Sequence, residues 1–378
     1  MQGFDLSTIQ GCYVGSTPAS AIYMGSNLIW PTGPHDYLTF EAITAGTVTI
    51  TATDPSYYLT ISYSIDEGQT WTDITTSGTE QTMATLNIGD KLLVKGNNNQ
   101  YGSEYIDQYA TIHSYYNHFG GTAQVEVYGN IMSLIYGDNF VGKNSFPSGS
   151  TGNFYRLFYN YSNLIDASNL ELPATTLAGG CYISMFRECT SLTTAPVLPA
   201  TTLANNCYNS MFRDCTSLST APELPATTLT DYCYQSMFYG CSSLTEAPTL
   251  PATTLTQYCY YSMFRGCTSL STAPELPATT LASNCYGYMF TGCVALITAP
   301  ELPATTAANR CYWNMFTDCT NLNYIKCLAT DDISTSDDYT FNWVYGVGSS
   351  GSFYGKQSAN WTYSINGIPS GWNVYYIV

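Results

Sequence analysis

The residues of this chain that could support the most chemistry are its cysteines, which recur in pairs. The two members of each pair lie eight positions apart, and the pairs repeat every 26 residues. The pairs are Cys181 and Cys189, Cys207 and Cys215, Cys233 and Cys241, Cys259 and Cys267, Cys285 and Cys293, and Cys311 and Cys319. Such a ladder could bind a metal, form disulfides or supply buried thiols.

The spacing favours buried free thiols. Zinc sites prefer cysteines separated by two to four residues, and the repeats contain no such pair. Two cysteines eight positions apart on a helix would be about 12 Å apart, which is too far for a disulfide. Helices of neighbouring repeats would pack about 8–10 Å apart, again beyond the usual disulfide distance. Cross-repeat disulfides and a metal site remain as alternatives, and free thiols suit a chain that folds in a reducing cytoplasm.

Other residues with catalytic or metal-binding chemistry form no constellation. His113 and His118 are five positions apart, which puts them on different faces of a helix or a strand. The repeat acids Glu223, Glu275 and Glu301 occur singly, at least one repeat apart, and do not supply the carboxylate pair of a glycosidase. The sequence has no Ser/His/Asp order, nucleotide loop or H-E-x-x-H motif. We therefore expect no enzyme activity, no cofactor and no metal.

One short motif in the first third of the chain has a known structural use. Residues 64–71 read SIDEGQTW, which fits the pattern S-x-D-x-G-x-T-W. The motif resembles the Asp-box hairpin turns of sialidase propellers, where Asp closes the turn and Gly adopts a left-handed conformation. A propeller needs several blades and this chain has a single copy, so a well-made hairpin turn is favoured over a sialidase-type enzyme.

Composition excludes two classes of partner. The chain has 378 residues, 34 of them Tyr, with 10 Lys+Arg and a net charge of −17. Nucleic acids and anionic lipids both require basic residues, so neither partner is expected. The first 31 residues lack the basic and apolar regions of a signal peptide. No stretch approaches the roughly 18 apolar residues of a membrane span, so no membrane insertion is expected.

The N-terminal part predicts β structure. The sequences CYVGS and IYMGS, ten residues apart, form a duplicated strand-and-turn unit within residues 1–35. From residue 36 to residue 140, alternating segments such as GTVTITAT, YLTISYSI, GDKLLVKG and TAQVEVYG are separated by turn residues. Spacings of roughly 8–12 residues between turns indicate an antiparallel, immunoglobulin-like β-sandwich.

The repeats occupy residues 141–327. The motif LPATT recurs with a period of 26, which indicates a solenoid of stacked units. In one unit the apolar residues are Cys207, Tyr208, Met211, Phe212 and Cys215, a wide stripe that predicts a short helix. Gly240, Gly266 and Gly292 would end that helix, and the prolines that follow limit the strand to a few residues.

Two resemblances accompany these patterns. MFRDCTSLSTAPELP resembles the unit of BspA-like leucine-rich repeat proteins, although this unit is longer and places Pro in the strand. The segment NWVYGVGSSGSFYGKQSANWTYSINGIPSGWNV resembles the segment that closes such arrays in proteins of gut Bacteroidetes. The start, YVGS…YMGSNLIWP, resembles that of structural proteins from phages and prophages of those bacteria. The expected chain is multidomain: a hairpin anchor (1–35), a β-sandwich (36–140), a leucine-rich-repeat solenoid with a short helix and short strand per unit (141–327) and a C-terminal cap (328–378).

Two variable rows of the repeat indicate where binding could occur. The position before the first cysteine and the position three residues later would be neighbours on a helix and would form an exposed ridge. The ridge residues suited to recognition are Tyr232, Gln235, Tyr258, Tyr261, Asn284, Arg310 and Trp313. Neutral variation at exposed positions is the alternative interpretation of these rows.

The resemblances imply a non-enzymatic tail or fibre-type protein on the surface of a phage virion, made in the host cytoplasm. It would attach to a host glycan or protein, contact other virion proteins through its N-terminal segment and form a homo-oligomer. The second hypothesis is a BspA-like adhesin on a bacterial cell surface.

Overall fold

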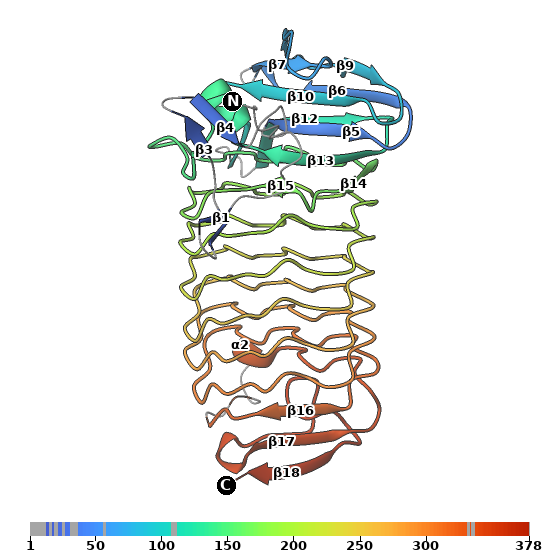
Figure 1. The fold of residues 1–378 in the computed structure, drawn as a ribbon. Coiled ribbons are helices and arrows are strands. Elements are labelled where there is room, and N and C mark those ends of the chain that lie inside the picture. Colours follow the sequence, from blue (N-terminus) through green and yellow to red (C-terminus); the bar gives the residue numbers. More distant parts are fainter. Residues whose placement is uncertain are drawn as a thin grey trace.

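The computed structural model describes residues 13–14, 17–18, 22–24, 27–30, 37–55, 58–106, 112–330, 333 and 337–377. Strands in several sheets dominate the regular structure, with two four-residue helices, α1 (Ser133–Tyr136) and α2 (Asp337–Thr340). Two 3-10 turns, η3 (Gly137–Asn139) and η4 (Gln357–Ala359), complete the described helical elements. The expected multi-sheet β architecture is confirmed at this level. Two packed sheets lie at one end of a stack of chain coils, and a small sheet lies at the other end (Figure 1).

The duplicated N-terminal unit contains two pairs of short strands. β1 (Tyr13–Val14) pairs with β2 (Thr17–Pro18), and β3 (Ile22–Met24) pairs with β4 (Asn27–Trp30). Both pairs are antiparallel, as a strand-and-turn duplication requires. The Gly-Ser turns themselves lie outside the described residues.

The two packed sheets are built from β5 to β13. The bounds are β5 (Leu38–Ala42), β6 (Gly46–Ala52), β7 (Thr60–Ser64), β8 (Thr72–Thr75), β9 (Gln81–Leu86), β10 (Lys91–Gly96), β11 (Gly102–Ile106), β12 (Ile112–Gly121) and β13 (Val125–Asn130). One sheet has the order β14-β13-β5-β10-β7-β8, in which β14 (Leu164–Asp166) comes from the first coil, and the other has the order β11-β12-β6-β9. Phe40 of the first sheet contacts Phe119 of the second, with ring centroids 5.0 Å apart. Alternation of apolar and polar residues creates these faces, because successive strand side chains point to opposite sides.

The repeats form coils of about one repeat each, but the helix expected in every repeat is absent from the described residues. Each coil instead contains a turn run, a series of linked tight turns such as the one over residues 204–215. The amide of Asn209 donates to the carbonyl of Asn206 in the same coil, at 3.3 Å. The next amide, of Ser210, donates to Gln235 in the following coil, at 2.8 Å. Amides thus bond alternately within the turn and to the next coil, whereas an α-helix would bond every amide four residues back.

The backbone conformation explains why the helix prediction was wrong. Asn206, Ser210 and Asp214 have φ of 62°, 56° and 60°, so the chain enters the left-handed region every fourth residue. A continuous right-handed helix excludes that conformation. The stripe at i, i+1, i+4, i+5 and i+8 therefore has a period of four, which resembles the helical period of 3.6.

The strand expected in each repeat is reduced to single bridges over most of the stack. Parallel bridges join Thr176 to Thr202 and Thr254 to Thr280. Longer strands occur only near the ends of the described stack: β14 (Leu164–Asp166), β15 (Leu170–Glu171) and β16 (Tyr324–Cys327). The prolines of each repeat lack an amide hydrogen, which limits ladder formation here.

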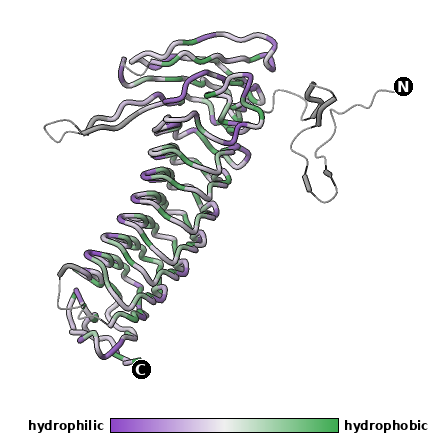
Figure 2. The backbone as a smooth tube through the Cα atoms, turned by 90° about the vertical axis from the view of Figure 1, so that its left-hand side faces the viewer, coloured by the Kyte–Doolittle hydropathy of each residue, from purple (hydrophilic) through white to green (hydrophobic). Residues whose placement is uncertain are grey.

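The core of the stack consists of rows in which the same residue type recurs in every coil. Figure 2 shows apolar segments recurring in successive coils along the tube. Phe212 stacks on Phe238 at 5.7 Å, and Tyr208 stacks on Tyr234 at 5.9 Å, with both pairs of rings parallel within 4°. Tyr260 is 1 % exposed, which confirms that its row belongs to the packed stripe. Each coil buries its apolar side only against its neighbours, as repeat proteins do.

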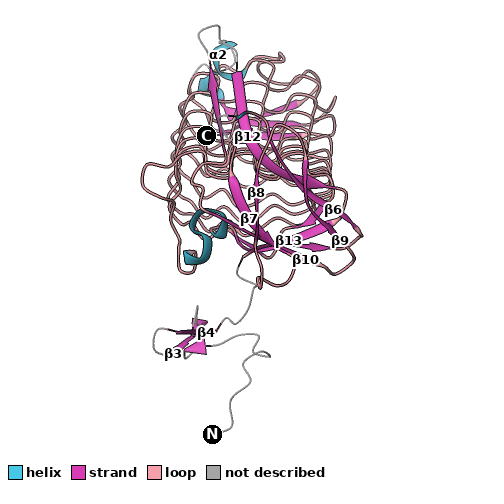
Figure 3. Cartoon of the chain, turned by 90° about the horizontal axis from the view of Figure 1, so that it is seen from above, coloured by secondary structure: helices cyan, strands magenta, loops and turns pink. Residues whose placement is uncertain are grey.

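The packed sheets close the first end of the stack by acting as a preceding coil. The amide of Phe119 in β12 donates to Leu157 of the first coil at 2.8 Å, and the amide of Val125 in β13 donates to Asn163 at 3.0 Å. Strand β13 also pairs in parallel with β14 and β15 of that coil. Seen from above, the strands of the packed sheets lie over the coils (Figure 3), and their buried residues share one apolar core with those of the first coil.

The other end is closed by tryptophans and a parallel sheet. Tyr312 and Phe316, from the last coil of each ring row, both pack on Trp343 at 6.1 Å, and Trp343 stacks on Trp361 at 5.6 Å. Strand β17 (Ser352–Lys356) lies between β16 and β18 (Asn373–Ile377). The turn-run bonding continues past residue 327, since Asp318 donates to Tyr345 at 2.7 Å.

Candidate binding face

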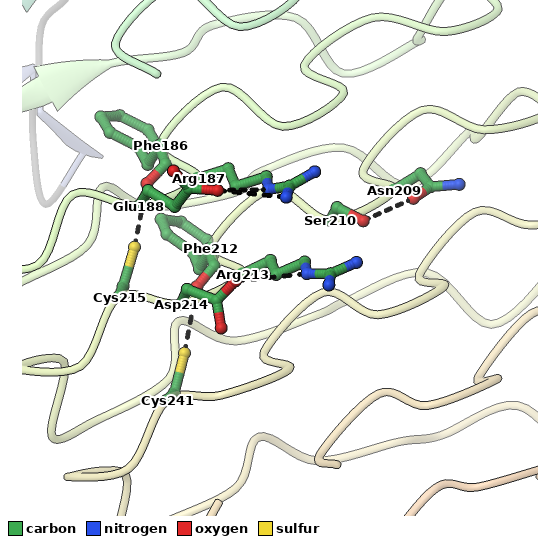
Figure 4. A network of polar contacts seen from close by, with 10 residues as sticks. All are labelled: Phe186, Arg187, Glu188, Asn209, Ser210, Phe212, Arg213, Asp214, Cys215 and Cys241. Atoms are coloured by element: carbon green, nitrogen blue, oxygen red, sulfur yellow. Dashed lines mark hydrogen bonds and ion pairs between the residues drawn. The ribbon is translucent and has the colours of Figure 1, made fainter. Parts of the chain in front are cut away.

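The thirteen cysteines of the described residues are buried, and each is a free thiol. The second cysteine of each pair donates to a phenylalanine carbonyl of the preceding coil, as Cys215 does to Phe186 at 3.0 Å and Cys241 to Phe212 at 3.1 Å (Figure 4). Burial raises the pKa of the Cys215 thiol well above its ordinary value and that of Cys319 to about 12, which keeps the S–H donors in place. The expected burial is confirmed, and these cysteines serve as part of the core.

The two histidines weighed as a metal pair lie in one strand. His113 and His118 both belong to β12, and the side chain of His113 is outside the described residues. Burial lowers the pKa of His118, and the charge of Glu80 opposes this. Within the described ranges, no three His, Cys, Asp or Glu residues are grouped as a metal site requires.

The repeat acids come closer together than the sequence indicated. Glu275 and Glu301 line one groove of about 390 Å³ between adjacent coils, together with Pro274, Pro277 and Pro300. Glu301 is paired with Lys326 at 2.8 Å. The carboxylate of Glu223, in an earlier coil, accepts a hydrogen bond from the Thr249 hydroxyl at 2.8 Å. Stacking thus brings the acids of this repeat position to one edge of the stack, although Val197 and Thr249 occupy the position in two of the coils.

The Asp-box-like segment forms the turn that its sequence predicts. The carboxylate of Asp66 accepts bonds from the Thr70 amide at 2.9 Å, the Thr70 hydroxyl at 2.6 Å and the Ser64 hydroxyl at 2.7 Å. Gly68 has φ of 83°, the left-handed conformation expected there. These bonds lower the pKa of Asp66 to about 2. The carboxylate is occupied in closing the hairpin between β7 and β8.

The outward side of the turn runs carries an array that we call the aromatic–arginine face. Every arginine of the chain lies on it, and each guanidinium sits over an aromatic ring. The nearest contacts are Arg156 over Tyr116 at 4.9 Å, Arg187 over Tyr159 at 5.8 Å, Arg213 over Tyr239 at 4.3 Å, Arg265 over Tyr288 at 5.2 Å and Arg310 over Trp313 at 4.3 Å. Cation–π contacts of this kind fix side chains that would otherwise be mobile.

Most of the residues predicted for the ridge meet on this face. Tyr232 stacks on Tyr258 at 4.9 Å, and Tyr258 contacts Tyr261 at 5.3 Å. These side chains are half-buried, as is Trp313, whereas Arg310 is exposed. The side-chain oxygen Oε1 of Gln235 accepts a hydrogen bond from Nδ2 of Asn209 at 3.0 Å.

The prediction of an exposed Asn284 is wrong. Asn284 is 4 % exposed and its amide donates to the Ser283 hydroxyl at 2.9 Å. Its φ of 56° belongs to a turn, where a short polar side chain bonds locally. The helical geometry assumed for the ridge would have turned this side chain outward.

Sequence reasoning missed the row that supplies most of the charge. Arg187, Arg213, Tyr239 and Arg265 occupy one repeat position, six residues after the first cysteine. Tyr288 replaces a serine that recurs in the earlier coils, and it joins Tyr261 to Trp313 at 5.4 Å and 6.1 Å. The recurrence of arginine at this position, which holds three of the five arginines, was the available signal. On a helix this position would lie four residues after the second ridge row and on the same face, so it could have been included in the ridge.

The comparisons with known proteins found nothing similar: no family model matches the chain, nor does any curated protein or solved structure. In the described part of the chain, no helix has the length and apolar character needed to cross a membrane.

Proposed function

We propose that this protein is a non-enzymatic attachment protein whose aromatic–arginine face binds a ligand on a cell surface. The observation that carries the proposal is the gathering of every arginine over aromatic rings on one side of the stack. In a chain with net charge −17 and 10 Lys+Arg, that distribution concentrates scarce positive charge where the rings are.

The order of the face supports binding. Ring contacts run from Tyr232 through Tyr258, Tyr261 and Tyr288 to Trp313 without a break. A ring that is already held loses little conformational entropy when a partner binds it. Aromatic and arginine side chains also dominate the energetics of protein interfaces.

For the fold, we infer a leucine-rich-repeat solenoid joined to an immunoglobulin-like sandwich. Three of the repeat positions shared with BspA-like proteins, Phe212, Cys215 and Leu218, are fully buried and support this assignment, whereas Ala221 is half-buried and Pro225 is exposed. The absence of a helix and the single-residue bridges in the described coils are departures from that family's pattern.

For the setting, we propose the surface of a phage virion, with a bacterial cell-surface adhesin as the second candidate. The resemblance of the N-terminal segment to virion proteins favours the first. On this proposal the segment contacts other virion proteins, and several copies of the chain assemble. The ligand is a glycan or protein of the host surface.

The proposal is tested by removing three rings from the face. Replacing Tyr258, Tyr261 and Trp313 by Ala should weaken attachment of the purified protein to gut Bacteroidetes cells by at least about tenfold, because aromatic hot spots contribute roughly 2 kcal/mol or more. Attachment is measured with labelled protein on cells, and a melting curve is recorded for the variant.

A matched control removes three rings elsewhere. Tyr345, Tyr363 and Tyr375 are 52 %, 62 % and 46 % exposed and belong to the C-terminal part. Their replacement by Ala should leave attachment unchanged. Normal attachment by the first variant, with an unchanged melting curve, would refute the proposal and assign recognition to another part of the chain.

A further inference from the structure

The arginines of the aromatic–arginine face differ in whether they have an acidic partner. Arg187 forms an ion pair with Glu188 at 3.1 Å, and Arg213 forms one with Asp214 at 3.3 Å (Figure 4). Among the described residues, Arg156, Arg265 and Arg310 form no ion pair, and of these Arg265 and Arg310 carry the rings of Tyr288 and Trp313. Their positive charge is therefore available to a ligand.

The rings that carry these two guanidiniums belong to one run of ring contacts with Tyr261. Burial raises the pKa of the Tyr261 hydroxyl, and Tyr288 and Tyr258 raise it further, whereas the charges of Arg265 and Arg310 lower it. The flanking rings are Tyr288, which carries Arg265 at 5.2 Å, and Trp313, which carries Arg310 at 4.3 Å.

The backbone of the next coil is shaped to hold Tyr261. A Cβ added to Gly287 would lie 2.9 Å from Cδ2 of the Tyr261 ring, so any other residue would displace the ring. Glycine occurs once in this row, next to the Tyr261 coil; the other members are Ile183, Asn209, Gln235 and Trp313. The ring can lie across the coil boundary only because this position has no side chain.

We propose that Arg265, Arg310 and the rings of Tyr261, Tyr288 and Trp313 form a binding site for carboxylated sugars of an acidic polysaccharide. This inference rests on the proposed attachment function and specifies its ligand. A guanidinium presents paired donors that match a carboxylate, and the half-buried rings leave apolar surface that suits the apolar face of a pyranose.

The charge of the chain argues for this ligand over nucleic acid. Affinity for nucleic acid depends on neutralising many phosphates, and this site offers two unpaired cations in a chain of net charge −17. Two fixed guanidiniums beside rings instead suit a polymer with one carboxylate per sugar and apolar sugar faces between the charges.

The test compares each acidic polysaccharide with its own neutral form. The full chain is titrated with polygalacturonate, alginate and hyaluronan, and with each polymer after its carboxylates have been reduced to alcohols. At least one acidic polymer should bind, and its reduced form should bind at least about tenfold more weakly. No binding to any of the three, or equal binding to an acidic polymer and its reduced form, would overturn the proposal.

Matched variants locate the site. Arg265→Gln with Arg310→Gln should abolish the binding, while Arg187→Gln with Arg213→Gln, which removes the paired arginines, should reduce it less than about twofold. Arg265→Lys with Arg310→Lys keeps the charge but loses the paired donors, and should give intermediate binding. Equal loss in both Gln pairs, or equal binding of dextran sulfate or single-stranded DNA, would show general charge attraction and overturn the site.

The outcomes also separate this inference from the proposed function. If the Arg265 and Arg310 variant loses polysaccharide binding and cell attachment together, the attachment function and the polysaccharide ligand are both supported. If the ring variant loses cell attachment while no acidic polysaccharide binds, the attachment function stands and the ligand class falls.

Discussion

The packed sheets and the coil stack satisfy the hydrogen bonds of their backbone amides in two different ways. In the sheets, strand amides bond to neighbouring strands, as along the β6 and β12 pair. In the coils, amides alternate between a turn partner and the next coil, as Asn209 and Ser210 do. The sheets bury a mixture of apolar residues around Phe40 and Phe119, whereas the coils bury rows of one residue type.

This difference shows that an apolar period of about four does not identify a helix. Turn runs with a left-handed residue every fourth position bury two neighbouring side chains in each group of four, as the face of a helix nearly does. What distinguishes the two is where the amide hydrogens go. A helix satisfies its own amides, and a turn run needs another coil beside it.

The largest expected effect is unfolding at alkaline pH, caused by ionisation of the cysteines that the coils bury. The described cysteines all lie at residue 181 or later, and burial raises their pKa above the ordinary 9.0. A raised folded-state pKa stabilises the protein below pH 9.0, and that stability is lost as pH rises further. Each thiol that ionises only in the unfolded chain costs about 1.4 kcal/mol per pH unit. We expect cooperative unfolding between about pH 9 and 11, followed by circular dichroism and tyrosinate absorbance.

Repeating the pH titration in 1 M salt distinguishes thiol ionisation from charge repulsion as the cause of unfolding. The net charge of −17 becomes more negative in alkali, and 1 M salt would screen that repulsion because the Debye length falls to about 3 Å. The desolvation of buried thiols is not screened, so the midpoint should change little in 1 M salt. Gradual ionisation of the cysteines near pH 9.0 without loss of structure would show that the thiols are accessible in the folded coils.

The sheets were the part of the fold that the sequence predicted best. The segments GTVTITAT, YLTISYSI, GDKLLVKG and TAQVEVYG correspond to β6, β7, β10 and β13, because period-two alternation and a two-faced strand are directly linked. The coil length and the buried rows also followed from the 26-residue repeat. The helix did not, because only the bonds between coils, which a single repeat cannot reveal, distinguish a turn run from a helix.

The candidate site was predictable where its contacts lie within one turn run and not where they join two coils. Tyr258 and Tyr261, three positions apart, are neighbours in a turn run as they would be in a helix, and they do touch. Arg265 and Tyr288 come from neighbouring coils and meet only through stacking. Asn284 is buried although Tyr258 and Arg310 share its repeat position and its left-handed φ, so its burial follows from its short side chain and its neighbours, which the sequence does not mark.

A second, smaller effect concerns the left-handed turns of the coils. Gly240 and Gly266 have φ of 75°, and Asp214 occupies the same repeat position with φ of 60°. A Cβ at Gly240 would lie 2.2 Å from Asp214 Oδ1, whereas a Cβ at Gly266 would meet nothing closer than 3.7 Å. Gly266→Ala should therefore lower the free energy of unfolding by about 1 kcal/mol, because alanine is strained at this left-handed φ. Gly240→Ala should lower it by about 1 kcal/mol more, because the added Cβ also meets Asp214.

A double variant isolates the contact between coils. Asp214→Ala also removes the ion pair with Arg213, so it is the reference for the double variant. Adding Gly240→Ala to Asp214→Ala should cost only about as much as Gly266→Ala does in the parent chain. The free energies are measured by denaturant unfolding. Equal losses for the two single glycine variants would mean that the Asp214 side chain moves freely aside, and the coils would then be less tightly fixed than the sheets.

The smallest effect concerns a turn of the sheets that a side chain closes. Bonds from Thr70 and Ser64 lower the pKa of Asp66 to about 2, below the ordinary 3.8. Because the folded-state pKa is the lower one, the carboxylate stabilises the fold above pH 3.8, and this stabilisation is lost as pH falls towards about 2. Asp66→Asn should therefore melt lower than the parent chain at neutral pH, and the difference should shrink as the pH is lowered through this range. The effect is small because the turn is open to water, which weakens its charge-assisted bonds.

The loss caused by Gly240→Ala involves no ionisation of the substituted residue and should stay constant over the same pH range. Equal melting of Asp66→Asn and the parent chain at every pH would show that the backbone of Gly68, and not the carboxylate, closes this hairpin. Turns in the sheets and turns in the coils would then be held by the same means.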